Sequence, residues 1–268
     1  RKNVLIIGAG LIGLKCLEGI LERVKSVSVA AMAGRILPSI LDDAGAAVVR
    51  RELEGKGAKF YLSDSVAKFD GGTAHLKSGK EIPFDIRGGA GGVRPNTELV
   101  KDAGGEVSRG VVTDEKQQPS LQNVYAAGDC AESFDITSGT RRVLALLPNA
   151  YRQGYTAGVN MAGGEAAFAD AMPLNAIGFF GSHVLTAGSY EGESFVQAEG
   201  DVYRRFFCKD GVLKGFILVN SPERAGIYTS LIRSKTPLSE VDFRSLEGAP
   251  NLAAFPRAAR ERTEAREV

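Results

Sequence analysis

The first part of the chain alternates short apolar runs with amphipathic stretches. Residues 3–7 read Asn-Val-Leu-Ile-Ile, a continuous apolar run typical of a buried parallel strand. Helical spacing follows over 14–23, a second strand pattern over 26–30, and a further helix over 41–56. This alternation predicts an α/β fold with a parallel sheet.

The middle of the chain predicts smaller elements. Short strands are expected over 59–62, 74–77, 111–113 and 123–126, the last leading into a turn at Gly128 and Asp129. A long helix is expected over 150–162, with Gly163 and Gly164 as its C-terminal cap.

After Pro173 the pattern changes to short β-like runs rich in Phe and Tyr. Lys209-Asp210-Gly211 predicts a hairpin turn between two of these runs, and 225–234 predicts a helix. The aromatic residues of this part are interpreted as core. Residues 257–268 mix Arg and Glu, which indicates a solvated helix or disorder.

Composition and charge argue against several classes of protein. The 268 residues leave room for more than one domain, and 33 basic residues balance 32 acidic ones, which argues against nucleic acid as a partner. No apolar run is long enough to span a bilayer, and we expect no membrane partner. Three separated cysteines argue against a disulfide framework and favour the cytoplasm. Two isolated histidines predict no metal site.

The clearest motif follows the first strand and reads Gly8-Ala9-Gly10-Leu11-Ile12-Gly13, a G-x-G-x-x-G loop between a strand and a helix. Gly8 would allow the tight turn, Gly10 would let a dinucleotide diphosphate approach the backbone, and Gly13 would let the helix pack closely. The helix N-terminus would offer free N–H groups to the diphosphate. The alternative is a glycine-rich turn without a ligand.

An acidic residue that binds the ribose hydroxyls is expected about 20 residues after such a loop when the ligand is NAD. Ala30-Ala31-Met32 stand there instead. Arg35 is the first polar side chain; it could meet a 2′-phosphate and favour NADP, contact the adenine or the diphosphate, or be solvated. The preference between NADH and NADPH stays open.

Four motifs occur in a familiar order: 8–13, Arg35-Ile36-Leu37-Pro38, 92–96 (Gly-Val-Arg-Pro-Asn) and 125–130 (Tyr-Ala-Ala-Gly-Asp-Cys). With them the chain resembles the FAD-dependent pyridine nucleotide-disulfide oxidoreductase superfamily, in its branch of NADH oxidases, rubredoxin reductases, coenzyme A-disulfide reductases and the flavin part of nitrite reductases. The resemblance implies a Rossmann-like NAD(P)-binding domain over 1–93, the C-terminal part of an FAD-binding domain over 94–170, and an α+β interface domain over 171–268 that forms a homodimer. The upstream FAD segment is expected to be missing from this chain.

The resemblance also assigns cofactor-binding residues. Gly8, Gly10, Leu11, Ile12 and Gly13 match the NAD(P) diphosphate loop, with Arg35 after the second strand. Gly92 matches the backbone along the nicotinamide, and Gly128 and Asp129 match the pair that meets FAD, where the Asp bonds a ribityl hydroxyl. Residues 147–154 match the helix start that faces the flavin. As alternatives, Asp129 could only cap a helix, and Gly154 and Gly158 are interpreted as helix-packing residues.

Residues 85–92 depart from the family, which has an apolar strand there. Arg87 and its neighbouring glycines would make a poor central strand, and the sequence leaves open whether a strand forms.

The function implied by the resemblance is an NAD(P)H:acceptor oxidoreductase with FAD. Hydride passes from the nicotinamide to the flavin, and electrons pass on to a small molecule or a small redox protein. No side chain of this segment is assigned as a catalytic residue. The alternative is a non-catalytic dinucleotide-binding or assembly module, or a subunit that needs a separate FAD-binding half.

Overall fold

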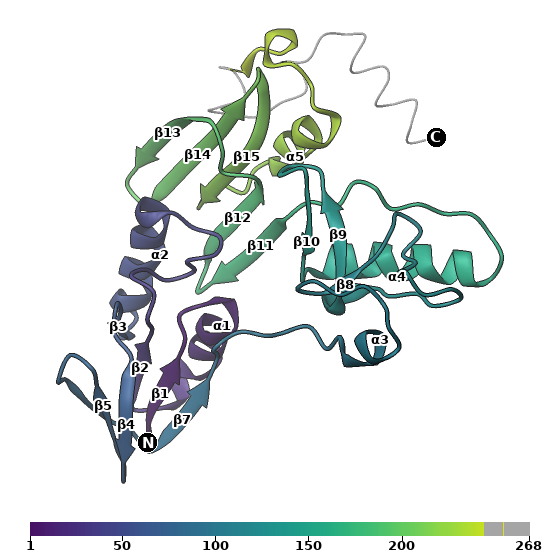
Figure 1. The fold of residues 1–268 in the computed structure, drawn as a ribbon. Helices are drawn as coiled ribbons and strands as arrows, with labels where there is room; N and C mark the ends of the chain where they lie inside the picture. The colour runs from purple at the N-terminus through teal and green to yellow at the C-terminus, as the bar shows by residue number, and fades with distance from the viewer. Residues whose placement is uncertain (244–253, 255–268) are drawn as a thin grey trace.

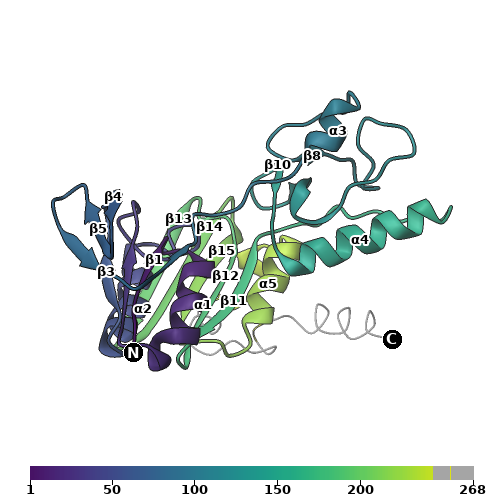
Figure 2. The same ribbon diagram turned by 90° about the horizontal axis from the view of Figure 1, so that it is seen from below.

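The computed structural model of the chain describes residues 1–243 and residue 254 (Figure 1). The expectation for 257–268 lies outside the described residues. Three units follow one another along the chain: an N-terminal α/β unit, a smaller middle unit, and a C-terminal antiparallel sheet (Figures 1 and 2).

The N-terminal unit is a parallel sheet in the order β3-β2-β1-β7, which confirms the α/β prediction. Strand β1 spans Asn3–Ile7 and β2 spans Ser26–Ala30, both within the predicted runs. The connecting helix α1 covers Leu11–Ile20, starting three residues earlier than predicted, and a short 3₁₀ turn covers Leu21–Arg23. The remaining elements are α2 (Asp43–Gly55), β3 (Lys59–Tyr61) and a meander of β4 (Val66–Asp70), β5 (Thr73–Leu76) and β6 (Glu81–Pro83).

The glycine-rich segment does form a strand. Strand β7 spans Ile86–Gly89 and pairs in parallel with β1, with Val4 opposite Ile86 and Ile7 opposite Gly89. It lies at the edge of the sheet, where Arg87 is exposed and stacks over the ring of Phe69. An edge strand tolerates a charged side chain and glycines that a central strand could not bury.

The middle unit contains a short helix α3 (Glu98–Asp102), three strands and a long helix. The strands are β8 (Val111–Val112), β9 (Ala131–Asp135) and β10 (Thr140–Val143), and α4 covers Leu147–Met161. The prediction of a strand over 123–126 is wrong. Only an isolated bond from the Ala126 N–H to the Gln117 carbonyl is found there in the described chain, and β9 forms instead after a 3₁₀ turn at Gly128–Cys130. A β-like sequence needs a neighbouring strand to pair with.

The C-terminal sheet has the order β11-β12-β15-β14-β13, with elements β11 (Leu174–Phe179), β12 (Ser182–Gly188), β13 (Glu193–Glu199), β14 (Val202–Lys209) and β15 (Val212–Val219). Asp210 and Gly211 form the predicted hairpin turn, and both have positive φ, 55° and 73°, as a type I′ turn requires. Helix α5 covers Ala225–Ser234, as predicted, and a 3₁₀ turn covers Leu238–Glu240.

One hydrophobic core joins the first and last units, which lie side by side in both ribbon views (Figures 1 and 2). Leu14, Leu17 and Leu53 of the N-terminal helices cluster with Phe179 and Phe207 of the C-terminal sheet. The sheet therefore backs the N-terminal unit. On α1, Leu14 and Leu17 occupy the inward face, and the Cys16 thiol is exposed.

Candidate functional site

The glycine loop begins where β1 ends. Gly8 has a φ of 115°, a conformation that L side chains rarely adopt, and a Cβ placed there would lie 2.2 Å from the Ala90 carbonyl oxygen. The Gly8 N–H donates to the Ala30 carbonyl at 2.8 Å. The turn therefore lies between the end of β2 and the residue that follows β7. Only glycine fits at its first position.

The other two glycines differ in their surroundings. A Cβ at Gly13 would lie 2.1 Å from the Gly8 carbonyl oxygen, so α1 packs directly against the loop. A Cβ at Gly10 would meet nothing within 4 Å. Gly10 is also the N-cap residue of α1, with extended backbone (φ −83°, ψ −174°), so neither packing nor conformation demands a glycine there. What the glycine provides is open space beside the helix N-terminus.

Helix α1 is suited to an anion at that end. It has ten residues, no acidic side chain in its first turn and no side-chain cap. Its first N–H groups lack intrahelical partners and carry the positive end of the helix dipole. Leu11 is half-buried and Ile12 is 60% exposed, so both lie at the open side of the loop.

The segment after β2 lies against the glycine loop. The Leu37 N–H donates to the Ala9 carbonyl at 2.8 Å, and Ile36 and Leu37 are fully buried. Met32, which stands where an acidic residue was expected, is 82% exposed. The Arg35 side chain donates to the Leu41 carbonyl at 2.8 Å and pairs with Asp43 at 3.2 Å. Arg35 therefore braces its own loop while part of its guanidinium stays accessible.

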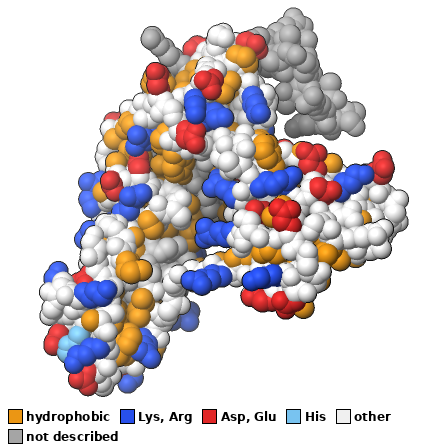
Figure 3. All heavy atoms as spheres, viewed as in Figure 1, with side chains coloured by type: hydrophobic (Ala, Val, Ile, Leu, Met, Phe, Trp, Pro, Cys, Tyr) orange, Lys and Arg blue, Asp and Glu red, His pale blue; other side chains and the backbone are white. Residues whose placement is uncertain are grey.

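A second candidate site lies in the middle unit. A pocket of about 400 Å³ is lined by residues that include Arg94, Asn96, Arg109, Asp129 and Cys130. Arg94 belonged to a motif used for the resemblance but was not predicted as a site residue, and no sequence signal pointed to Arg109. Figure 3 shows Lys and Arg side chains gathered along the hollow between the N-terminal and middle units. The hollow is chemically suited to anionic groups.

Helix α4 holds the Gly128–Asp129 turn. The Gly128 N–H donates to Gln153 Oε1 at 2.6 Å, and the Gln153 amide in turn bonds the Ser133 hydroxyl. Asp129 is exposed within the 3₁₀ turn, and the N-cap residue of α4 is Leu146. Asp129 therefore does not cap that helix, and the residue lines the pocket.

The structure brings the predicted residues together in two groups. Gly8 and Gly13 lie close to Ala90, which leads through Gly92 (φ 100°) into the 93–96 segment. That segment lines the pocket containing Asp129. Arg35 lies apart, at the loop after β2. No group of three His, Cys, Asp or Glu side chains that could hold a metal occurs in the part of the chain that the structure describes.

Comparison with known proteins places these features in a family. The family model described as pyridine nucleotide-disulphide oxidoreductase matches residues 1–154. The epsilon subunit of NADH-dependent phenylglyoxylate dehydrogenase from Aromatoleum evansii is 29% identical over 91% of this chain and 61% of its own length. NADH oxidase from Methanocaldococcus jannaschii is 40% identical over 62% of this chain and 38% of its own length.

Solved structures agree with this fold. An NAD-dependent persulfide reductase from A. fulgidus matches with a TM-score of 0.83 and 25% identity, covering 90% of this chain and 50% of that one. A water-forming NADH oxidase from Lactobacillus brevis matches with a TM-score of 0.80 and 18% identity, over 89% of this chain and 59% of that one. The chain thus spans about 61% or less of the length of the curated relatives described here. Over the described residues, no helix has the length and apolar character needed to cross a membrane.

Proposed function

Because the chain belongs to the pyridine nucleotide-disulphide oxidoreductase family, we propose that it is the NAD(P)H-binding and flavin-contacting part of an NAD(P)H:acceptor oxidoreductase. Family membership implies FAD and NAD(P)H as cofactors. The observation that carries the proposal is the geometry of the glycine loop: Gly8 and Gly13 are required by packing, whereas Gly10 leaves open space at a helix N-terminus. A dinucleotide diphosphate fits that arrangement.

The proposed roles follow from where the side chains lie. Gly10, Leu11 and Ile12 would face the NAD(P)H diphosphate, and Gly92 would follow the nicotinamide half. Asp129 would accept a hydrogen bond from the flavin ribityl chain, and the N-terminus of α4 would stabilise negative charge at the flavin. The flavin, when bound, takes hydride from the nicotinamide and passes electrons to a second acceptor. The protein residues bind and orient the two cofactors.

We propose that the chain binds NADPH at least as well as NADH. No carboxylate stands at Ala30, Ala31 or Met32 to receive the ribose hydroxyls, and Arg35 offers a partly exposed guanidinium nearby in the sequence. Asp43 pairs with that guanidinium but is 91% exposed, so a 2′-phosphate could replace it at little cost.

The acceptor is proposed as a small molecule or a small redox protein. Relatives include a rubredoxin-NAD(+) reductase from Pseudomonas putida, 33% identical over 56% of this chain. A homodimer formed through the C-terminal unit and a cytoplasmic location complete the proposal.

Visible absorbance tests the flavin part of this proposal. The purified full chain, incubated with FAD and freed of excess by gel filtration, should keep the flavin absorbance bands and lose them when NADH or NADPH is added without oxygen. A chain that retains no FAD would contradict a self-sufficient flavin site.

The surface of helix α4 favours the second candidate function, a subunit completed by a separate FAD-binding half. Its buried face is made of small or polar residues, including Asn149, Gln153 and Thr156. Its exposed face carries no charge and includes Leu147 (84% exposed) and Tyr151 (73%). The same face holds Tyr155, Gly154, Gly158 and Met161.

The interpretation of Gly154 and Gly158 as helix-packing residues does not hold within the chain. A Cβ at either glycine would meet nothing within 4 Å among the described residues. An uncharged helix face of this size marks a contact with another segment. We propose that a flavin-holding segment covers it.

Substitution of the exposed tyrosines tests this candidate. The double variant Tyr151→Lys/Tyr155→Lys should keep the thermal stability of the isolated chain, because both side chains are exposed. It should lose association with a polypeptide that supplies FAD. FAD binding by the chain alone, unaffected in this double variant, would contradict the second candidate.

A further inference from the structure

The loop between β2 and α2 connects the glycine loop with the C-terminal sheet. At one end, the Leu37 N–H donates to the Ala9 carbonyl, with Leu37 buried and held at a φ of 48°. Ile40 and Leu41 then bond back to the Leu37 carbonyl at 3.0 and 2.9 Å. A displacement of this loop would therefore disturb the hydrogen bond between the Leu37 N–H and the Ala9 carbonyl, and with it the glycine loop.

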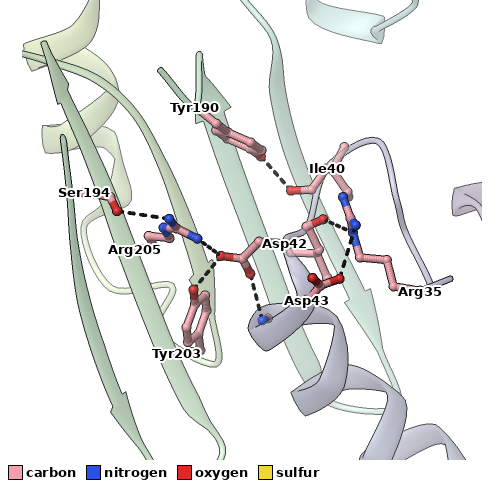
Figure 4. Close-up of polar contacts among 10 residues, drawn as sticks. Arg35, Ile40, Asp42, Asp43, Tyr190, Ser194, Tyr203 and Arg205 are labelled. Atoms are coloured by element: carbon pink, nitrogen blue, oxygen red, sulfur yellow. Dashed lines mark hydrogen bonds and ion pairs between the residues drawn. The ribbon is translucent and has the colours of Figure 1, made fainter. Parts of the chain in front are cut away.

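Three side chains of the C-terminal unit form hydrogen bonds with the other end of this loop (Figure 4). The Tyr190 hydroxyl donates to the Ile40 carbonyl at 2.6 Å. The Tyr203 hydroxyl and the Arg205 guanidinium both donate to Asp42 Oδ2, at 2.6 and 2.8 Å.

These anchors are held in place within their own sheet. The rings of Tyr190 and Phe207 stack with centroids 4.8 Å apart, and the Arg205 guanidinium lies 4.9 Å from the same Phe207 ring. Arg205 also donates to the Ser194 hydroxyl at 3.0 Å. The C-terminal unit thus presents to the loop three donors that have contacts with their own neighbours.

The two carboxylate oxygens of Asp42 accept hydrogen bonds from different units. Oδ1 accepts from the Gly45 N–H at 2.9 Å and caps α2, while Oδ2 receives Tyr203 and Arg205. Burial alone would raise the pKa of Asp42, but the hydrogen bonds from Tyr203, Arg205 and Gly45 outweigh it and keep that pKa low. Both contacts are consequently charge-assisted. A Cβ at Gly45 would lie 3.3 Å from the Tyr203 ring, so the glycine lets the helix approach this closely.

We infer that Tyr190, Tyr203 and Arg205 are positioning residues for NAD(P)H: through Ile40 and Asp42 they hold the β2–α2 loop, and through Leu37 that loop holds the glycine loop. None of the three belongs to the glycine motif. The inference rests on the proposed function. It means that nucleotide affinity depends on the C-terminal sheet, which the nucleotide itself need not touch.

A second contact between the same two units provides a matched control. On α1, Glu18 Oε1 accepts from the Phe180 N–H at 2.7 Å, and Lys15 donates to the Gly178 carbonyl at 3.1 Å. These bonds join the N-terminal unit to the end of β11 and the turn after it, without touching the β2–α2 loop. Their loss should weaken the interface but leave the loop in place.

Titration of the full chain with NADH and with NADPH tests the inference. Wild type is compared with Tyr203→Phe, Tyr190→Phe and Glu18→Ala, with the melting temperature of each and titrations at a temperature where all are folded. Each Tyr→Phe change removes one hydroxyl and keeps the ring, so both variants should fold. Each should raise the nucleotide Kd about fivefold, the effect of one lost hydrogen bond, and Glu18→Ala should leave the Kd within about twofold.

Unchanged Kd values in both tyrosine variants would overturn the inference while leaving the proposed function intact. An equal rise in Kd for Glu18→Ala would also overturn it, because the effect would then come from the interface in general. A wild-type chain that binds neither nucleotide would overturn the proposed function and the inference with it.

Discussion

The Cβ position of Gly13 lies 2.1 Å from the carbonyl oxygen of Gly8, a distance that no side chain can occupy. Helix α1 therefore starts in direct contact with the turn that leaves β1. This contact fixes where the helix N-terminus points, and it separates the glycines needed for packing from the one that leaves room for a ligand.

Replacement of Gly13 should mainly affect folding. Gly13→Ala forces α1 away from the loop and should lower the free energy of unfolding by about 1–3 kcal/mol, measured by urea denaturation. Gly19→Ala on the same helix is the control, since a Cβ there meets nothing within 4 Å; it should raise stability by about 0.5–1 kcal/mol. Equal stability of Gly13→Ala and wild type would refute the packing role.

Asp129 should matter for flavin and not for the fold. The residue is exposed and lines the pocket with Arg94 and Arg109. Asp129→Ala should change the free energy of unfolding by less than about 0.5 kcal/mol and should weaken FAD binding in the holoprotein. Retention of FAD at wild-type affinity would show that this carboxylate does not hold the flavin.

Arg35 should distinguish the two nucleotides. Arg35→Ala should raise the Kd for NADPH about tenfold through loss of a charge-assisted contact, with a much smaller change for NADH. Asp43→Asn, which frees the Arg35 guanidinium, should tighten NADPH binding. An equal loss for both nucleotides in Arg35→Ala would mean that Arg35 acts only by bracing its loop.

The acid limb of the stability curve should depend on Asp135. This carboxylate is fully buried in β9; burial raises its pKa, but hydrogen bonds from Thr137 and the charge of Arg142 outweigh that and leave its pKa lowered. Its stabilisation is thus present above the unfolded pKa of about 3.9 and is lost as the pH falls through the lower folded value.

Asp135→Ala should consequently lower the free energy of unfolding at pH 7 by about 3 kcal/mol, and the difference from wild type should shrink at acidic pH. Urea denaturation between neutral pH and pH 3 measures both effects. A constant difference across that range would contradict the assignment.

Local patterns predicted the elements that depend on neighbours in sequence. The apolar run of β1, the strand β2, helix α5 and the Asp210–Gly211 turn have local causes, and the structure confirms them. The strand expected over 123–126 does not form, because a strand also needs a neighbouring strand to pair with. Strands β4 and β10 were also not predicted, although each pairs with its neighbour in sequence, β5 and β9, and Gly71-Gly72 offered a local turn signal for the first pair.

Contacts between distant residues were beyond sequence reasoning. Tyr203 and Asp42 are 161 positions apart, and neither carries a motif. Arg109 reaches the pocket of Asp129 only because the middle unit folds 93–96 and β10 around it. The edge position of β7, which makes room for Arg87, likewise follows from the order of the sheet.

Titration of Gly10→Val with NADH and NADPH tests the central claim most directly. The extended backbone at Gly10 accepts a β-branched residue and no neighbour lies within 4 Å, so the variant should melt at the wild-type temperature. Wild type should bind the nucleotides, and the variant should show at least about a tenfold higher Kd because its side chain fills the space of the diphosphate. Wild-type affinity in a folded Gly10→Val chain would contradict the claim that the glycine loop is the nucleotide site.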